Sequence, residues 1–63
     1  MRDRYLCQFQ DVGKDYFITD CAFQDGQLNK AKAYVKMIIL STHTTRRGQV
    51  YDQAAKRVVH SYG

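Results

Sequence analysis

Every second residue near the start of the chain is apolar. Tyr5, Cys7 and Phe9 fall on one side of an extended segment, whereas Leu6 and Gln8 fall on the other. A period of two residues is typical of a strand whose two sides meet different surroundings.

A second alternating segment follows residues 11–15, whose Asp and Gly residues supply turn chemistry. The two segments together predict a β-hairpin over residues 4–23. With its tip at residues 12–13, Cys7 pairs with Ile18 and not with Cys21, so the thiols are not expected to be cross-strand neighbours. The residues on one side of the second strand are Phe17, Thr19, Cys21 and Phe23.

The spacing then changes to that of a helix over about residues 27–41. Asp25 precedes this segment and is a candidate N-cap, since its carboxylate can accept hydrogen bonds from exposed backbone amides. Residues 34–40 contain three β-branched side chains, so a buried strand remains an alternative there. The residues sharing the helical face are Leu28, Ala31, Val35, Ile38 and Ile39.

Residues 49–62 predict a second amphipathic helix. Their apolar positions follow an i, i+1, i+4, i+5 rhythm, and Asp52 and Lys56 form a favourable i, i+4 pair. A hairpin is the competing interpretation, but its turn, Gln-Ala-Ala-Lys, offers no Gly, Asn or Asp for a positive φ. The apolar positions are Val50, Tyr51, Ala54, Ala55, Val58, Val59 and Tyr62.

These elements predict one α+β domain over residues 1–63: a β-hairpin followed by two helices (ββαα), in two layers, with both helices on one face of the sheet. With 63 residues, of which 44% are hydrophobic, the chain can build one small core. A homodimer would enlarge that core and is a further expectation. The expected core comprises Phe9, Phe17, Cys21, Phe23, Leu28, Val35, Ile38, Val50, Ala54 and Val58.

Charge is distributed unevenly along the chain. Ten Lys and Arg residues stand against six Asp residues and no Glu, which gives a formal net charge of +4. Residues 1–25 carry three basic and five acidic side chains, a balance of −2, whereas residues 26–63 carry seven and one, a balance of +6. The later part is therefore expected to associate with anionic surfaces.

Two sets of residues are candidates for anion contact. Residues 41–48 place Thr44, Thr45, Arg46 and Arg47 beside the N-terminus of the expected last helix, where free amides and the helix dipole attract a phosphate. Capping by one of the threonines, with solvated arginines, is the alternative. The second set lies on the expected helices and is suited to phosphate contacts that carry no sequence information: Lys32, Lys36, Lys56 and Arg57.

Tyr5, Tyr16 and Tyr34 are the aromatic residues left for partner contact, because the phenylalanines are needed in the core and the remaining tyrosines fall on an apolar stripe. Aromatic residues and arginine are favoured interface anchors.

Neither a metal site nor a catalytic site is predicted. The two cysteines and two histidines occur as C-x13-C and H-x16-H, too widely spaced for the close ligand pairs of small zinc sites. No nucleophile elbow or phosphate-binding glycine loop is present, so we expect a non-enzyme without cofactors. The chain begins Met-Arg-Asp-Arg and its longest apolar run is four residues, which favours a cytoplasmic protein that does not span a membrane.

The sequence thus predicts a small regulatory protein that binds nucleic acid or a nucleoprotein through its basic C-terminal two-thirds. The alternative is a protein-interaction module or inhibitor that docks on an acidic host-protein surface, as accessory regulators of the phage type do. No motif indicates a particular family.

Overall fold

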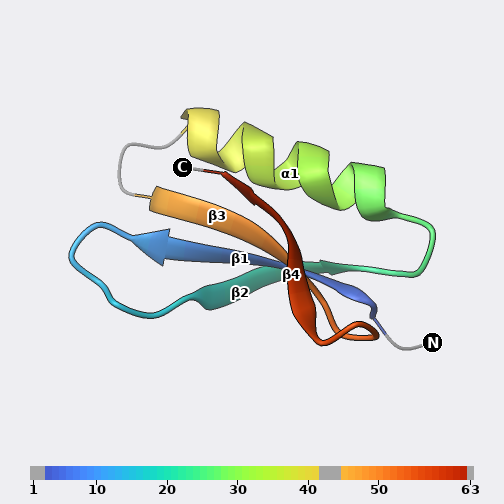
Figure 1. The fold of residues 1–63 in the computed structure, drawn as a ribbon. Coiled ribbons are helices and arrows are strands. Elements are labelled where there is room, and N and C mark those ends of the chain that lie inside the picture. The colour runs from blue at the N-terminus through green and yellow to red at the C-terminus, as the bar shows by residue number, and fades with distance from the viewer. Residues whose placement is uncertain (1–2, 42–44, 63) are drawn as a thin grey trace.

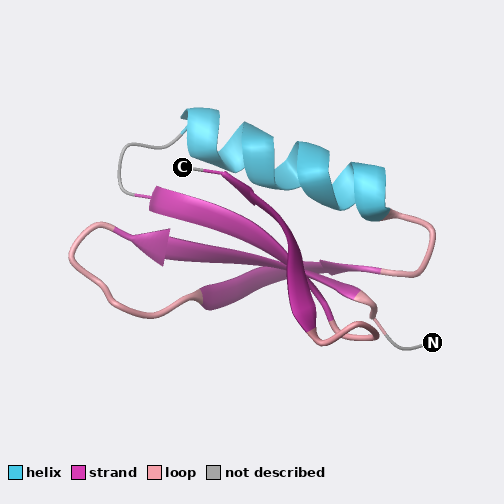
Figure 2. Cartoon of the chain, viewed as in Figure 1, coloured by secondary structure: helices cyan, strands magenta, loops and turns pink. Residues whose placement is uncertain are grey.

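The computed structural model describes residues 3–41 and 45–62 of the chain. The described residues form one four-stranded sheet and one helix that lies across one side of it (Figures 1 and 2). The elements are β1 (Tyr5–Asp11), β2 (Ile18–Phe23), α1 (Leu28–Ser41), β3 (Thr45–Asp52) and β4 (Arg57–Tyr62).

The strands lie in the order β2-β1-β3-β4, and every neighbouring pair is antiparallel. Because β2 and β3 are both antiparallel to β1, they run parallel to each other on either side of it, and α1 makes the crossover between them. The expected ββαα arrangement is therefore wrong: the order is ββαββ, with a single helical layer over the sheet among the described residues.

The helix expected over residues 49–62 is a hairpin of β3 and β4. The Asp52 carboxylate accepts the backbone N–H groups of Ala54 at 2.9 Å and Ala55 at 3.2 Å. Lys56 takes the left-handed conformation, with φ of 56°, which we had expected to need Gly, Asn or Asp. The carboxylate before the turn thus supplies the turn chemistry that the turn residues lack.

A β-bulge explains the helix-like spacing of the same segment. Tyr51 pairs with Val58 while Val50 pairs with His60, so Val59 is an extra residue in β4. The bulge interrupts the period of two, and the apolar residues then follow a rhythm that resembles a helical face.

The β1–β2 hairpin and α1 occupy the regions in which a hairpin and a helix were expected. The expected register is wrong, however, because Cys7 lies directly opposite Cys21, and both thiols are free. The connection between the strands spans residues 12–17 instead of a two-residue tip, and Asp20 is an extra residue where the β1–β2 register shifts.

The start of α1 also differs from the expectation. Asp25 does not cap the helix; it accepts a hydrogen bond of 2.5 Å from Arg4. The side-chain oxygen of Gln27 instead accepts the backbone N–H of Gln24 at 2.9 Å, and the Gln27 carbonyl accepts the N–H of Ala31.

The core lies between α1 and the sheet. Gly48 permits a close approach of the two layers, because a Cβ atom there would lie 2.6 Å from Cγ1 of Val35. Three residues expected in the core lie outside its cluster: Phe17, Ala54 and Val58. The buried members are Tyr5, Cys7, Phe9, Ala31, Val35 and Val50.

Candidate nucleic-acid interface

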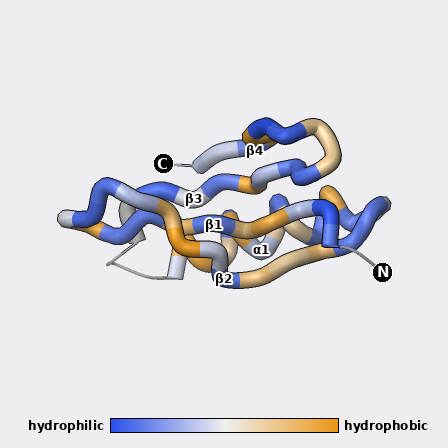
Figure 3. The backbone as a smooth tube through the Cα atoms, turned by 90° about the horizontal axis from the view of Figure 1, so that it is seen from below, coloured by the Kyte–Doolittle hydropathy of each residue, from blue (hydrophilic) through white to orange (hydrophobic). Residues whose placement is uncertain are grey.

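The side of the sheet opposite α1 is not covered by any described element; Figure 3 shows it from below, with α1 behind the strands. Alternation along β1 assigns its residues to the two sides, since Cys7 and Phe9 are buried under α1 while Leu6, Gln8 and Gln10 are half-buried. We call this uncovered side the open face.

Strand register arranges the open face into rows of differing character. An apolar row crosses all four strands at one end of the sheet, and an amide row crosses its middle. Beyond the amide row, Gln10 of β1 pairs with Arg47 of β3, which places a cation at the other end. The apolar row is Ala22, Leu6, Tyr51 and Val58, and the amide row is Thr19, Gln8, Gln49 and Ser61.

Hydrogen bonds link the amide row across three strands. Nε2 of Gln49 donates to Oε1 of Gln8 at 2.7 Å, and Nε2 of Gln8 donates to Oγ1 of Thr19 at 3.2 Å. Each glutamine amide carries two N–H groups, so this chain uses one from each side chain. The second N–H groups remain as donors toward a ligand on the open face.

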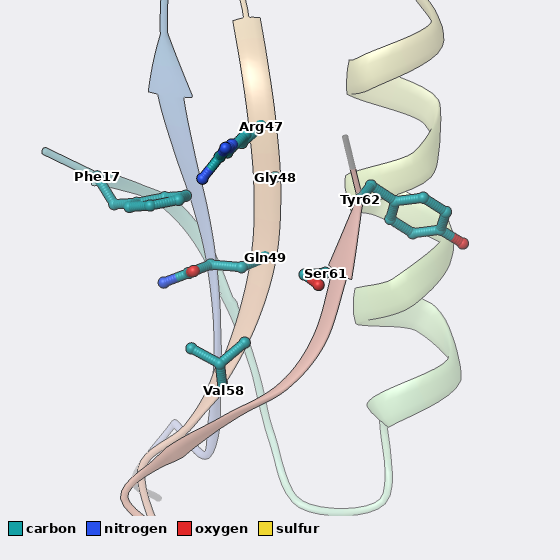
Figure 4. A pocket seen from close by; sticks show the side chains of 7 residues that line it. All are labelled: Phe17, Arg47, Gly48, Gln49, Val58, Ser61 and Tyr62. Atoms are coloured by element: carbon teal, nitrogen blue, oxygen red, sulfur yellow. The ribbon is translucent and has the colours of Figure 1, made fainter. Parts of the chain in front are cut away.

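A cavity of about 420 Å³ opens beside this row. Figure 4 shows the Arg47 side chain extending toward the Phe17 ring, with Gln49 beside them, whereas Tyr62 points away toward α1. The volume lies within the range of small-molecule sites, about 300–1,000 Å³. The lining residues are Phe17, Arg47, Gly48, Gln49, Val58, Ser61 and Tyr62.

The carboxylates of Asp52 and Asp20 are engaged by an ion pair and by hydrogen bonds. Arg4 contacts both oxygens of Asp52 at 3.2 Å, which holds the pKa of Asp52 below its usual range; the N–H groups of Ala55 and Ala54 lower it further. Asp20 accepts a hydrogen bond from the hydroxyl of Tyr34. None of the described residues in the apolar and amide rows, nor Gln10 and Arg47, is acidic, and Arg47 is the cation among them.

The structure separates the cations that the sequence singled out. Arg47 is exposed and lines the cavity, whereas Lys32 and Lys36 lie on α1, on the other side of the molecule. Lys56 is exposed in the β3–β4 turn, and Arg57 begins β4. The helix N-terminus expected to hold an anion beside residues 41–48 does not exist, because β3 begins at Thr45; Thr44 and the side chains of Thr45 and Arg46 lie outside what the structure describes.

The tyrosines differ in their availability. Tyr5 is 6% exposed and belongs to the core, so it offers no surface to a partner. Tyr34 packs edge-on against Phe9 and Phe23, and its hydrogen bond to Asp20 raises its pKa to about 12. Tyr16 is 51% exposed and remains a partner-contact candidate.

Sequence reasoning missed Phe17, Gln8 and Gln49 as site residues. The signal for Gln8 was present, because it alternates with the buried residues of β1 and so lies on the opposite side. Phe17 was assigned to the core for its size, and Gln49 to a helix that does not form.

Nothing among the described residues suggests a metal site, since no group of three or more His, Cys, Asp or Glu side chains comes together there. No described helix has the length and apolar character needed to cross a bilayer. Comparison with family models, curated proteins and solved structures gave no match for this chain.

Proposed function

We propose that this protein is a small, non-enzymatic regulatory protein that binds nucleic acid on the open face of its sheet. The observation that carries the proposal is the arrangement of that face. Arg47 borders the cavity, hydrogen-bonding amides lie at the centre, and no described residue in the rows is acidic. Guanidinium groups suit phosphate oxygens, and phosphate contacts supply much of the affinity of nucleic-acid binders.

Lys56 and Arg57 lie at the opposite end of the sheet from Arg47. Arg57 pairs with Asp52, five residues along β3 from Arg47. At about 3.3 Å per residue, the two arginine positions are separated by roughly 17 Å. Because an odd number of residues separates Asp52 from Arg47, alternation places Asp52 and its partner Arg57 on the α1 side, and Arg47 is the cation of the open-face rows among the described residues.

Binding of fluorescent DNA and RNA at low salt tests this function. We expect Arg47→Ala to weaken binding and to reduce the slope of log affinity against log salt by about one. Lys36→Ala is the matched control, because it removes the same charge from the exposed side of α1 and leaves the open face intact. No binding at low salt, or equal losses in the two variants, contradicts the proposal.

A protein-interaction module that docks on an acidic surface is the second candidate. It is favoured by exposed apolar side chains at the end of the sheet nearest Arg47: Val12 is 60%, Tyr16 is 51% and Ile18 is 52% exposed. This function predicts no nucleic-acid affinity and specific recovery of one host protein, which Tyr16→Ala abolishes. Homodimerisation stays a separate prediction, and sedimentation showing only monomer would remove it.

A further inference from the structure

We infer that the cavity on the open face accepts an unpaired nucleobase, so that the protein selects single-stranded nucleic acid over duplex; this rests on the proposed function. The cavity combines one aromatic wall, Phe17, with the amide of Gln49 and the guanidinium of Arg47 (Figure 4). These groups match the three parts of a nucleotide: the face of the base, its edge and its phosphate.

Phe17 provides the stacking surface. It lies just before β2, is half-buried, and lies outside the core cluster formed with α1. Because this large aromatic side chain lies outside the core, it exposes apolar area that a stacked base can cover. Stacking on an aromatic ring tolerates every base, because each has a π-face.

Gln49, Gln8 and Ser61 provide the hydrogen bonds. The Gln49–Gln8–Thr19 chain orients the amides across the strands, so their remaining donors are held in place before a ligand arrives. The Ser61 hydroxyl lies in the same row and lines the same cavity. Such groups can pair with the Watson–Crick edge of a base only where that base is not already paired.

The breadth of the sheet argues against duplex. Three inter-strand spacings of about 4.8 Å separate β2 from β4 by roughly 14 Å, whereas the DNA major groove is about 12 Å wide. The sheet cannot insert its open face into the groove, and a stacked, paired base cannot reach the cavity. A second copy of this chain is the other occupant that could cover the apolar row. Sedimentation with and without oligonucleotide distinguishes such a dimer from a complex with nucleic acid.

The test compares three labelled probes at low salt: an unstructured oligonucleotide of about 10 nucleotides, its duplex, and an abasic strand of the same length. We expect the wild-type protein to bind the unstructured strand at least about tenfold more tightly than either other probe. Phe17→Leu should weaken binding to the unstructured strand about tenfold and leave abasic binding unchanged. Tyr16→Leu is the matched control, because this neighbouring aromatic residue does not line the cavity.

NMR of the wild-type protein keeps the test decisive if Phe17→Leu fails to fold. Addition of the unstructured strand should shift the side-chain amide signals of Gln8 and Gln49, while those of Asn29 on α1 and Gln53 in the β3–β4 turn remain in place. Equal binding of all three probes overturns the base cavity but leaves nucleic-acid binding standing. Absence of binding to any probe overturns both, as does a stable dimer that excludes oligonucleotide.

Discussion

The covered and open faces of the sheet are built from alternate residues of the same strands, yet they differ in burial and in polarity. Along β3, Val50 is fully buried against α1, whereas its neighbours Gln49 and Tyr51 are half-buried on the other side. Cys7 and Phe9 of β1 are buried in the core, while Gln8 between them takes part in a hydrogen-bonded row.

This difference shows how a chain of 63 residues divides its apolar surface. A domain of this size buries only about 60% of the surface its unfolded chain exposes, so the one described helix closes one face of the sheet and the other face stays uncovered. The covered face fixes the fold, and substitutions there should change stability. The open face can vary in chemistry at little cost to stability.

The sharpest contrast is expected between Val50→Glu and Gln49→Glu. A carboxylate at Val50 would be buried without a partner, which costs several kcal/mol and rivals the total stability of roughly 3–9 kcal/mol for a domain of this length. Gln49→Glu should retain the fold, with a change of about 1 kcal/mol or less, and lose nucleic-acid affinity. Circular dichroism and thermal unfolding measure the fold and stability of the two variants, and binding of labelled oligonucleotide measures the affinity of Gln49→Glu. A folded Val50→Glu variant would show that the two faces are not distinct.

Gly48→Ala should cost about 1–3 kcal/mol, because the added Cβ would lie 2.6 Å from Cγ1 of Val35 and 3.1 Å from Cγ1 of Ile39. Urea unfolding gives the free-energy change. The double variant Gly48→Ala/Val35→Ala removes the clashing methyl and should be more stable than the sum of the single effects predicts. If the free-energy changes of the two single variants simply add up in the double variant, close packing of α1 on β3 is not the reason why position 48 is glycine.

Asp52→Asn should weaken the closure of the β3–β4 hairpin and change how stability depends on pH. The Arg4 hydrogen bonds hold the folded pKa of Asp52 below its unfolded value, so their contribution is present above about pH 4 and is lost as the pH falls through the folded pKa. The wild-type protein should therefore lose more stability in acid than Asp52→Asn does. Asp15→Asn, in the exposed β1–β2 connection, is the control, and parallel acid profiles for all three proteins would contradict the prediction.

The smallest expected effect is a difference in labelling rate between the two thiols, which can be measured without destabilising the protein. Burial raises the pKa of Cys7 to about 11, so little thiolate forms near neutral pH, whereas Cys21 is only half-buried. In single-cysteine variants, Cys21→Ser should label only as fast as the protein opens, and Cys7→Ser should label more rapidly. Equal rates would place the two thiols in similar surroundings.

The first part of the fold could be predicted from local patterns. The recurrence of apolar residues at Tyr5, Cys7 and Phe9 indicates a strand with one buried side, and apolar spacing around Ala31 and Val35 indicates a helix. Both local patterns correspond to the observed elements because β1 and α1 are each regular over their length. The β1–β2 register could not be predicted, since the length of the connection and the bulge at Asp20 are invisible to a period of two.

The helix predicted over residues 49–62 was wrong because the interactions that decide the structure of this segment are not local. A bulge at Val59 disturbs the alternation, and the turn depends on the carboxylate of Asp52, which is itself held by Arg4, 48 residues away. Pairing of β3 with β1 satisfies backbone groups that a helix would otherwise satisfy within its own turns. Helical spacing of side chains therefore gave the wrong element.

The candidate site shows the same division. Arg47 was singled out by its charge and remains in the proposed interface, although on a strand and not beside a helix end. Phe17 could not be grouped with Arg47, because the two residues are 30 positions apart in the chain and only the sheet brings them to one cavity. Gln49 is two positions from Arg47, but its segment was interpreted as a helix.

The sequence by itself determined the uneven charge, with −2 on residues 1–25 and +6 on residues 26–63, the alternating sides of β1, and the amphipathic character of α1. Tertiary structure decided that residues 45–62 form a β-hairpin, that Cys7 pairs with Cys21, and which side of the sheet stays open. Charge and periodicity are properties of neighbouring residues, whereas strand pairing depends on which distant segment supplies the hydrogen-bond partners.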